Sequence, residues 1–133
     1  MKMEEFLNKA KELNAKIELL VEADCNDADY LINVEAFSYD EFVKYNIQER
    51  YNMLKLFEDK DEAVWEVAEK AYNEDYYGSW HHEYTLTPQE IDMLAENWNT
   101  ICDYIPYNVS DEWRPCHTVT KVELRIVIPY EGE

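Results

Sequence analysis

Carboxylates are the residues of this chain best suited to chemistry, and they are grouped. The stretch from Glu22 to Asp29 holds four acidic residues and no basic one, and the stretch from Glu58 to Asp75 holds eight acidic residues against two lysines. Such groups attract cations and basic protein surfaces. The candidate partner-binding carboxylates in them are Asp24, Asp27, Asp29, Glu58, Asp59, Asp61, Glu62, Glu66, Glu69, Glu74 and Asp75.

Three of these carboxylates form a stripe if their segment is helical. Glu62, Glu66 and Glu69 are spaced i, i+4 and i+7, and like charges at this spacing destabilise a helix by a few tenths of a kcal/mol per pair. Because they are polar positions in an otherwise apolar periodic pattern, we expect them to face solvent. The stripe favours a negative face for a basic groove, and a solvated face of an acidic protein is the alternative explanation.

Aromatic residues are dense just after the second acidic group. Five of them lie within the thirteen residues from Tyr72 to Tyr84. Tyrosine and tryptophan dominate the centres of protein interfaces, so Tyr76, Tyr77 and Trp80 are candidate partner-binding residues. The alternative interpretation is that these aromatic residues fill the core of a small domain.

The histidines do not predict a metal site. His81 and His82 are adjacent, and adjacent side chains on a strand point to opposite faces. Cys116 and His117 are also adjacent, so they too would point to opposite faces of a strand. We therefore expect no metal, and the absence of a recognisable nucleophile motif leads us to expect no catalytic residues.

The net charge of the chain indicates that its partner is positively charged. The chain has 30 acidic and 12 basic residues in 133, a formal net charge of −18, yet 47% of its residues are hydrophobic. That apolar content is enough for a packed core, so a folded domain carries the charge. Only two glycines are present, where average usage of about 7% gives about nine. Phosphate-cradling loops need several glycines, so we expect no nucleotide cofactor. The negative field of the protein repels phosphates, so we also expect no direct nucleic-acid binding.

The cysteines and the hydropathy suggest a reducing compartment. The three cysteines, Cys25, Cys102 and Cys116, form no CxxC pair, so we expect reduced thiols. The acidic start has no apolar signal region, and no apolar run approaches the ~18 residues of a membrane span. These features predict a cytoplasmic protein that does not enter a membrane.

Three start signals and several periodic runs define the elements. Ser38 with Glu41, Asp59 with Glu62, and Thr87 with Glu90 after Pro88 have the pattern of capping boxes that begin helices. Residues 16–22 fit either a helix or a strand, and we favour a strand because a turn-like segment follows. The predicted helices cover 3–14, 38–57, 59–72 and 87–102, the predicted strands cover 16–22, 30–36 and 121–128, and 105–116 is a loop.

These elements predict a single α+β domain over residues 1–133. It has an antiparallel sheet of three or four strands, with strands 16–22 and 30–36 as a hairpin, and about four helices packed on one face. The inner face predicted for the helix 38–57 comprises Phe42, Val43, Ile47, Tyr51, Leu54 and Phe57.

The small size, the net charge and the acidic groups at 22–29 and 58–75 together resemble the nucleic-acid-mimic inhibitors of phages, the anti-CRISPR and anti-restriction proteins. The resemblance is one of character, without a shared motif. It implies that carboxylates occupy the Lys and Arg sites that normally hold phosphates, so that the inhibitor binds the basic groove of a DNA- or RNA-handling protein.

Other functions fit the same pattern. An immunity protein that neutralises a basic nuclease toxin has the same electrostatics, and a non-enzymatic acidic adaptor or a small enzyme remains open. The sequence does not separate the first two, because both place an acidic face on a basic site.

Overall fold

The computed structural model describes residues 2–25, 30–58, 60, 63–72, 86–105 and 117–128. Their strands form one antiparallel sheet of β1 (Lys16–Cys25), β2 (Tyr30–Phe37) and β3 (His117–Val127), in the order β2-β1-β3. β1 is the central strand and β1 and β2 form the predicted hairpin. The strand prediction for residues 16–22 is thus confirmed.

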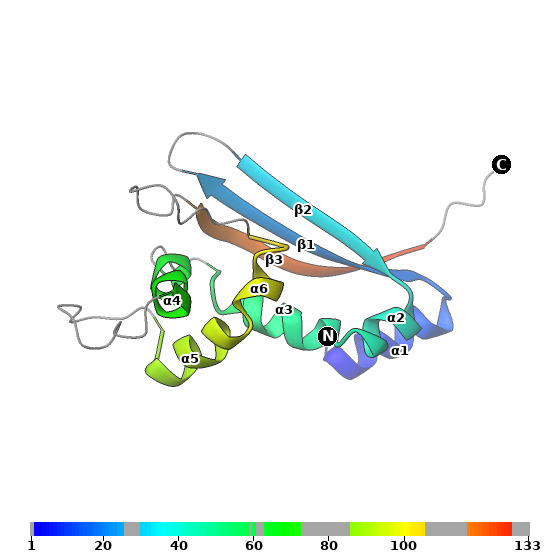
Figure 1. The fold of residues 1–133 in the computed structure, drawn as a ribbon. Helices are drawn as coiled ribbons and strands as arrows, with labels where there is room; N and C mark the ends of the chain where they lie inside the picture. Colours follow the sequence, from blue (N-terminus) through cyan, green and yellow to red (C-terminus); the bar gives the residue numbers. More distant parts are fainter. Residues whose placement is uncertain are drawn as a thin grey trace.

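Six helices in the described residues lie on one face of this sheet (Figure 1). They are α1 (Met3–Glu12), α2 (Tyr39–Lys44), α3 (Ile47–Lys55), α4 (Ala63–Tyr72), α5 (Pro88–Glu96) and α6 (Trp98–Ile101). No described helix covers the opposite face, which is called the open face below. The predicted α+β class and the one-sided packing are confirmed.

The strand register explains which side chains reach the core. Ile17, Leu19 and Val21 are at most 1% exposed, and they pair across β1–β3 with Ile126, Leu124 and Val122 on the same face. This row packs against buried residues of the helices such as Phe42, Leu54, Val64, Ile91 and Ile101. Burying one such side chain is worth about 1.5–3 kcal/mol, so this single core holds the two layers together.

The capping boxes at Ser38 and Thr87 form as predicted, and the one predicted at Asp59 and Glu62 lies outside the described residues. The Ser38 and Thr87 hydroxyls accept from the backbone N–H of Glu41 and Glu90, and each glutamate accepts from the backbone N–H of its cap. These local hydrogen bonds satisfy N–H groups that the first helical turn leaves unpaired. The sequence therefore located both helix starts correctly.

The predicted helix 38–57 is divided in two. Asn46 has a left-handed backbone, with φ 56°, between α2 and α3, and Asn is one of the few residues that adopt this conformation readily. The break changes the direction of the inner face, so Val43 is 57% exposed instead of buried as predicted. The helix 87–102 is likewise divided, at Asn97, which is why six helices replace the expected four.

In the middle of β2 the apolar side chains face away from the helices and the polar side chains face toward them. Its apolar residues Ile32 and Val34 are 57% and 45% exposed and pair with positions of β1 on the open face. Its polar residues Asn33 and Glu35 lie on the helix side. There the Asn33 amide donates to the Asp103 carbonyl oxygen at 2.8 Å.

Candidate partner-binding surface

The structure describes four of the predicted partner-binding residues. Asp24 is exposed at the end of β1, Glu69 is half-buried on α4, Glu66 is buried and Glu58 lies between α3 and α4. The remaining ten lie outside the described residues: Asp27, Asp29, Asp59, Asp61, Glu62, Glu74, Asp75, Tyr76, Tyr77 and Trp80. The histidine pair 81–82 and the loop 106–116 are outside them as well.

The prediction that Glu66 faces solvent is wrong. Glu66 is only 2% exposed. α4 contacts β3, α5 and α6, so the helix is covered on more than its apolar stripe, and the turn around Glu66 is enclosed with it. The supposed stripe of three carboxylates is therefore not a uniform exposed face.

Glu58 has a structural role. Its carboxylate accepts the backbone N–H of Val122 on β3 at 2.8 Å and an ammonium hydrogen of Lys55 at 2.8 Å. Burial opposes ionisation, but these hydrogen bonds outweigh it, so the pKa of Glu58 is lowered. The side chain is 25% exposed, which leaves little of its charge for a partner.

The net charge is unevenly distributed along the chain. Of the 30 acidic and 12 basic residues, 18 and 11 are in the described part. That part carries a net charge of −7, and the other residues carry −11 with Arg114 as their only base. Ten of the acidic residues outside the described part, together with Arg114, belong to the segments that connect described parts of the chain, so these segments carry −9, half of the net charge.

Described residues that flank two of these segments lie at one end of the sheet. Asp24 pairs with Tyr30, and Cys25 pairs with His117, so segments 26–29 and 106–116 join the described chain at neighbouring positions. α4, which segments 59–62 and 73–85 flank in the sequence, contacts β3 and lies beneath this end of the sheet (Figure 1). Below, this end is called the acidic end.

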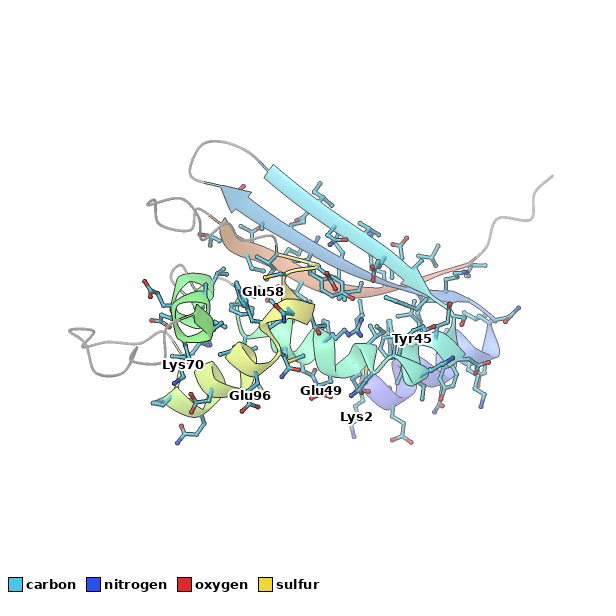
Figure 2. All side chains as sticks on the ribbon, viewed as in Figure 1. Lys2, Tyr45, Glu49, Glu58, Lys70 and Glu96 are labelled. Atoms are coloured by element: carbon cyan, nitrogen blue, oxygen red, sulfur yellow. The ribbon has the colours of Figure 1, made fainter. Side chains whose placement is uncertain are left out.

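The described helices add scattered exposed carboxylates. Figure 2 shows Glu49 and Glu96 on the side of the helical layer turned away from the sheet, and Glu58 between the two layers. Other exposed acids on this layer are Glu4, Glu5, Glu12, Asp40, Glu41 and Asp92. Lysines such as Lys2, Lys9 and Lys44 are interleaved with them, so the helical layer is less one-sided in charge than the connecting segments.

The open face combines apolar and paired charged residues. Arg125 bonds Glu18 across the strands at 2.9 Å, and Lys121 bonds Glu123 along β3 at 3.1 Å. Beside these pairs stand the exposed Ile32 and Val34 of β2. Because the charges largely neutralise one another, this face differs in character from the acidic end.

A polar network behind β2 is structural. The Tyr104 hydroxyl, in a residue 3% exposed, donates to Glu35 at 3.1 Å and accepts from Arg50 at 3.4 Å. Burial is the main cause that raises the pKa of Tyr104, so the hydroxyl stays protonated and holds α3 to β2. The pKa of the half-buried Cys102 thiol is also raised, chiefly by burial, which makes it a poor nucleophile.

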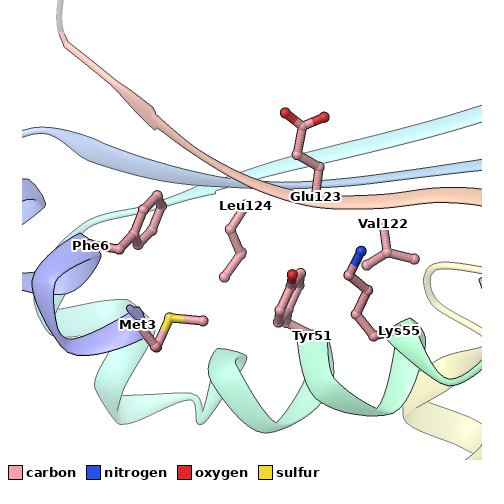
Figure 3. A pocket seen from close by; sticks show the side chains of 7 residues that line it. All are labelled: Met3, Phe6, Tyr51, Lys55, Val122, Glu123 and Leu124. Carbon is pink, nitrogen blue, oxygen red and sulfur yellow. The ribbon is translucent and has the colours of Figure 1, made fainter. Parts of the chain in front are cut away.

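A cavity of about 250 Å³ lies beneath the edge of β3, between α1 and α3. Figure 3 shows Met3, Phe6, Tyr51 and Leu124 around it, with Glu123 pointing to the other side of the strand. Lys55, Val122 and Glu123 complete its lining. The sequence marked several of these positions as apolar but gave no signal that they meet, because three distant segments form the cavity.

Within the described ranges, no group of three or more His, Cys, Asp or Glu side chains is placed to hold a metal ion. None of the helices in that part of the chain is both long and apolar enough to cross a membrane. No protein-family model, curated protein or solved structure matches the chain.

Proposed function

We propose that this protein is an acidic inhibitor that binds the basic nucleic-acid-binding groove of a DNA- or RNA-handling protein, in the manner of anti-CRISPR or anti-restriction proteins. The observation that carries the proposal is the net charge of −18 on a folded α+β domain. Such a field costs stability through self-repulsion and attracts a basic partner.

The distribution of charge supports the acidic end as the contact. Segments 26–29, 59–62, 73–85 and 106–116, which adjoin this end or α4 in the sequence, contain ten acidic residues and two basic ones, Lys60 and Arg114. Duplex DNA carries one negative charge per roughly 1.7 Å of its axis. Carboxylates of these segments would compete for the lysines and arginines that otherwise hold phosphates.

The proposal is tested with a panel of purified nucleases, including CRISPR effectors and restriction enzymes. Each is titrated with this protein, and the retention of a labelled DNA or RNA substrate is measured by gel shift. An inhibitor displaces the substrate from its target without binding the nucleic acid itself. Its affinity for the target falls steeply with salt, because exposed charges are screened over about 8 Å at physiological ionic strength.

A matched pair of variants separates local from overall charge. One variant neutralises Asp27, Asp29, Asp59 and Asp61 to Asn, and the control neutralises four carboxylates of the helical layer, Glu4, Glu5, Glu49 and Glu96, to Gln. Both raise the net charge from −18 to −14. The proposal expects the first variant alone to lose inhibition.

Equal losses in the two variants would show that only net charge matters. Displacement of substrate from none of the panel would refute the proposal as stated. Inhibition confined to a toxin nuclease would instead identify the protein as an immunity protein.

A further inference from the structure

We propose that the free edge of β3 and the cavity beneath it bind an extended, basic peptide segment by strand addition, with one large apolar side chain of that segment in the cavity. The proposal deepens the proposed function by naming a part of the partner and its contact. It rests on that function for the sign of the partner's charge.

The orientation of the edge follows from one hydrogen bond. The backbone N–H of Val122 donates to the Glu58 carboxylate at 2.8 Å, so it points away from β1. Backbone groups alternate in direction along an antiparallel strand. Leu124 and Ile126 therefore each direct an N–H and a C=O outward as well, and no described strand pairs with this edge.

Glu58 sets the limit of the edge. Its carboxylate already occupies the outward N–H of Val122 and is held by Lys55. An added strand consequently begins at Leu124 and extends toward Ile126. Such outward groups are a template for pairing with another chain, and main-chain hydrogen bonds supply the affinity when a peptide adds to an edge.

The cavity lies where an added residue would place its side chain. A residue opposite Leu124 projects to the same face of the sheet as Leu124, which is the face lined by Phe6, Tyr51 and Met3 (Figure 3). About 250 Å³ is less than most cofactor or drug-sized ligands need. An apolar cavity of roughly 150 Å³ accepts benzene, so a phenylalanine or leucine side chain fits.

The charge of the protein selects the occupant. The residues next to the inserted one project to the open face beside Glu123 and Arg125. These two are already paired with Lys121 and Glu18, so the preference for a basic segment comes from the net charge of −18. A second copy of this chain is the competing occupant, but each copy carries −18, and like charge opposes its approach. A basic segment is attracted instead.

The test uses a fluorescein-labelled synthetic peptide, Thr-Lys-Val-Lys-Phe-Lys-Val-Lys-Thr, whose Phe and Val alternate with lysine. Binding to the full chain is measured by anisotropy, and the backbone amides are followed by NMR. The expected result is that the amides of Leu124 and Ile126 shift most and become protected from exchange. Replacing the peptide Phe by Ser, at unchanged charge, weakens binding by roughly ten-fold or more.

Three protein variants complete the test. Met3→Trp fills the cavity and weakens binding by roughly ten-fold or more, whereas Leu13→Trp, an exposed position at the other end of α1, leaves it unchanged. Leu124→Pro removes one outward N–H without breaking a bond to β1 and also weakens binding. The folding of each variant is verified by thermal unfolding.

Several outcomes would overturn the inference. Affinity that is insensitive to the Phe→Ser peptide and to Met3→Trp but falls with salt would leave the acidic attraction standing and remove the edge site. Sedimentation that shows a dimer broken by Met3→Trp would assign the edge to a second copy. Conversely, loss of peptide binding in Met3→Trp, together with failure of the wild-type protein to displace substrate from any nuclease of the panel, would retain the edge site and refute the proposed inhibition.

Discussion

Glu58→Ala should destabilise the protein by about 2 kcal/mol. The Val122 N–H loses a charged acceptor at 2.8 Å, and hydrogen bonds to charged groups contribute about 1.5–3 kcal/mol. The Lys55–Glu58 ion pair, with its partners 41% and 25% exposed, adds little because exposed pairs are worth about 0–1 kcal/mol. For a chain of this length the loss corresponds to a Tm lower by about 8 °C.

Glu58→Gln separates the two contributions. The amide oxygen still accepts from Val122, so we expect a loss of at most about 1 kcal/mol. Because the pKa of Glu58 is lowered in the folded chain, its ionised form contributes stability at pH values above its ordinary pKa. That contribution is lost as the pH falls through the folded-state pKa. The gap between wild type and Glu58→Gln should therefore close in acid.

Urea unfolding followed by tryptophan fluorescence at neutral and acidic pH measures these differences. Glu96→Ala, which removes an exposed carboxylate, is the control and should change stability by less than about 0.5 kcal/mol. If Glu58→Ala is as stable as wild type, or if Glu58→Gln and Glu58→Ala lose the same amount, the assignment of Glu58 as the acceptor for the β3 edge is refuted.

Three further predictions concern stability. Glu66→Lys should unfold or strongly destabilise the protein, because it places an ammonium at a site 2% exposed, whereas Glu69→Lys at a half-buried position should leave circular dichroism and Tm nearly unchanged; equal tolerance of both would contradict the burial of Glu66. Tyr104→Phe should cost about 1 kcal/mol by removing the hydroxyl that joins α3 to β2, measured by urea unfolding, and an unchanged midpoint would argue against that bridge. Thr87→Ala should cost about 1 kcal/mol through loss of the cap to Glu90, and a Tm equal to that of wild type would argue against the capping box.

From the sequence, only the negative charge of the candidate binding surface could be predicted. The excess of carboxylates is a property of composition, so the expectation of a basic partner required no structure. Which carboxylates are available could not be predicted, because availability depends on neighbours. Glu58 is engaged by β3, and Glu66 is enclosed by the elements around α4.

Local chemistry allowed the sequence by itself to determine several elements. The two capping boxes need only residues three positions apart, and the alternation in β1 and β3 reflects a period set by the backbone. The helix starts at Ser38 and Thr87 and the three strands were therefore predicted correctly.

Tertiary structure alone decided how these elements meet. The apolar alternation of β2 predicted a strand but not that Ile32 and Val34 would face away from the helices. That choice follows from the register with β1 and from the hydrogen bonds that Asn33 and Glu35 make on the helix side. The cavity under β3 likewise depends on contacts among α1, α3 and β3, which no local pattern encodes, because side chains distant in the sequence become neighbours only when the layers pack.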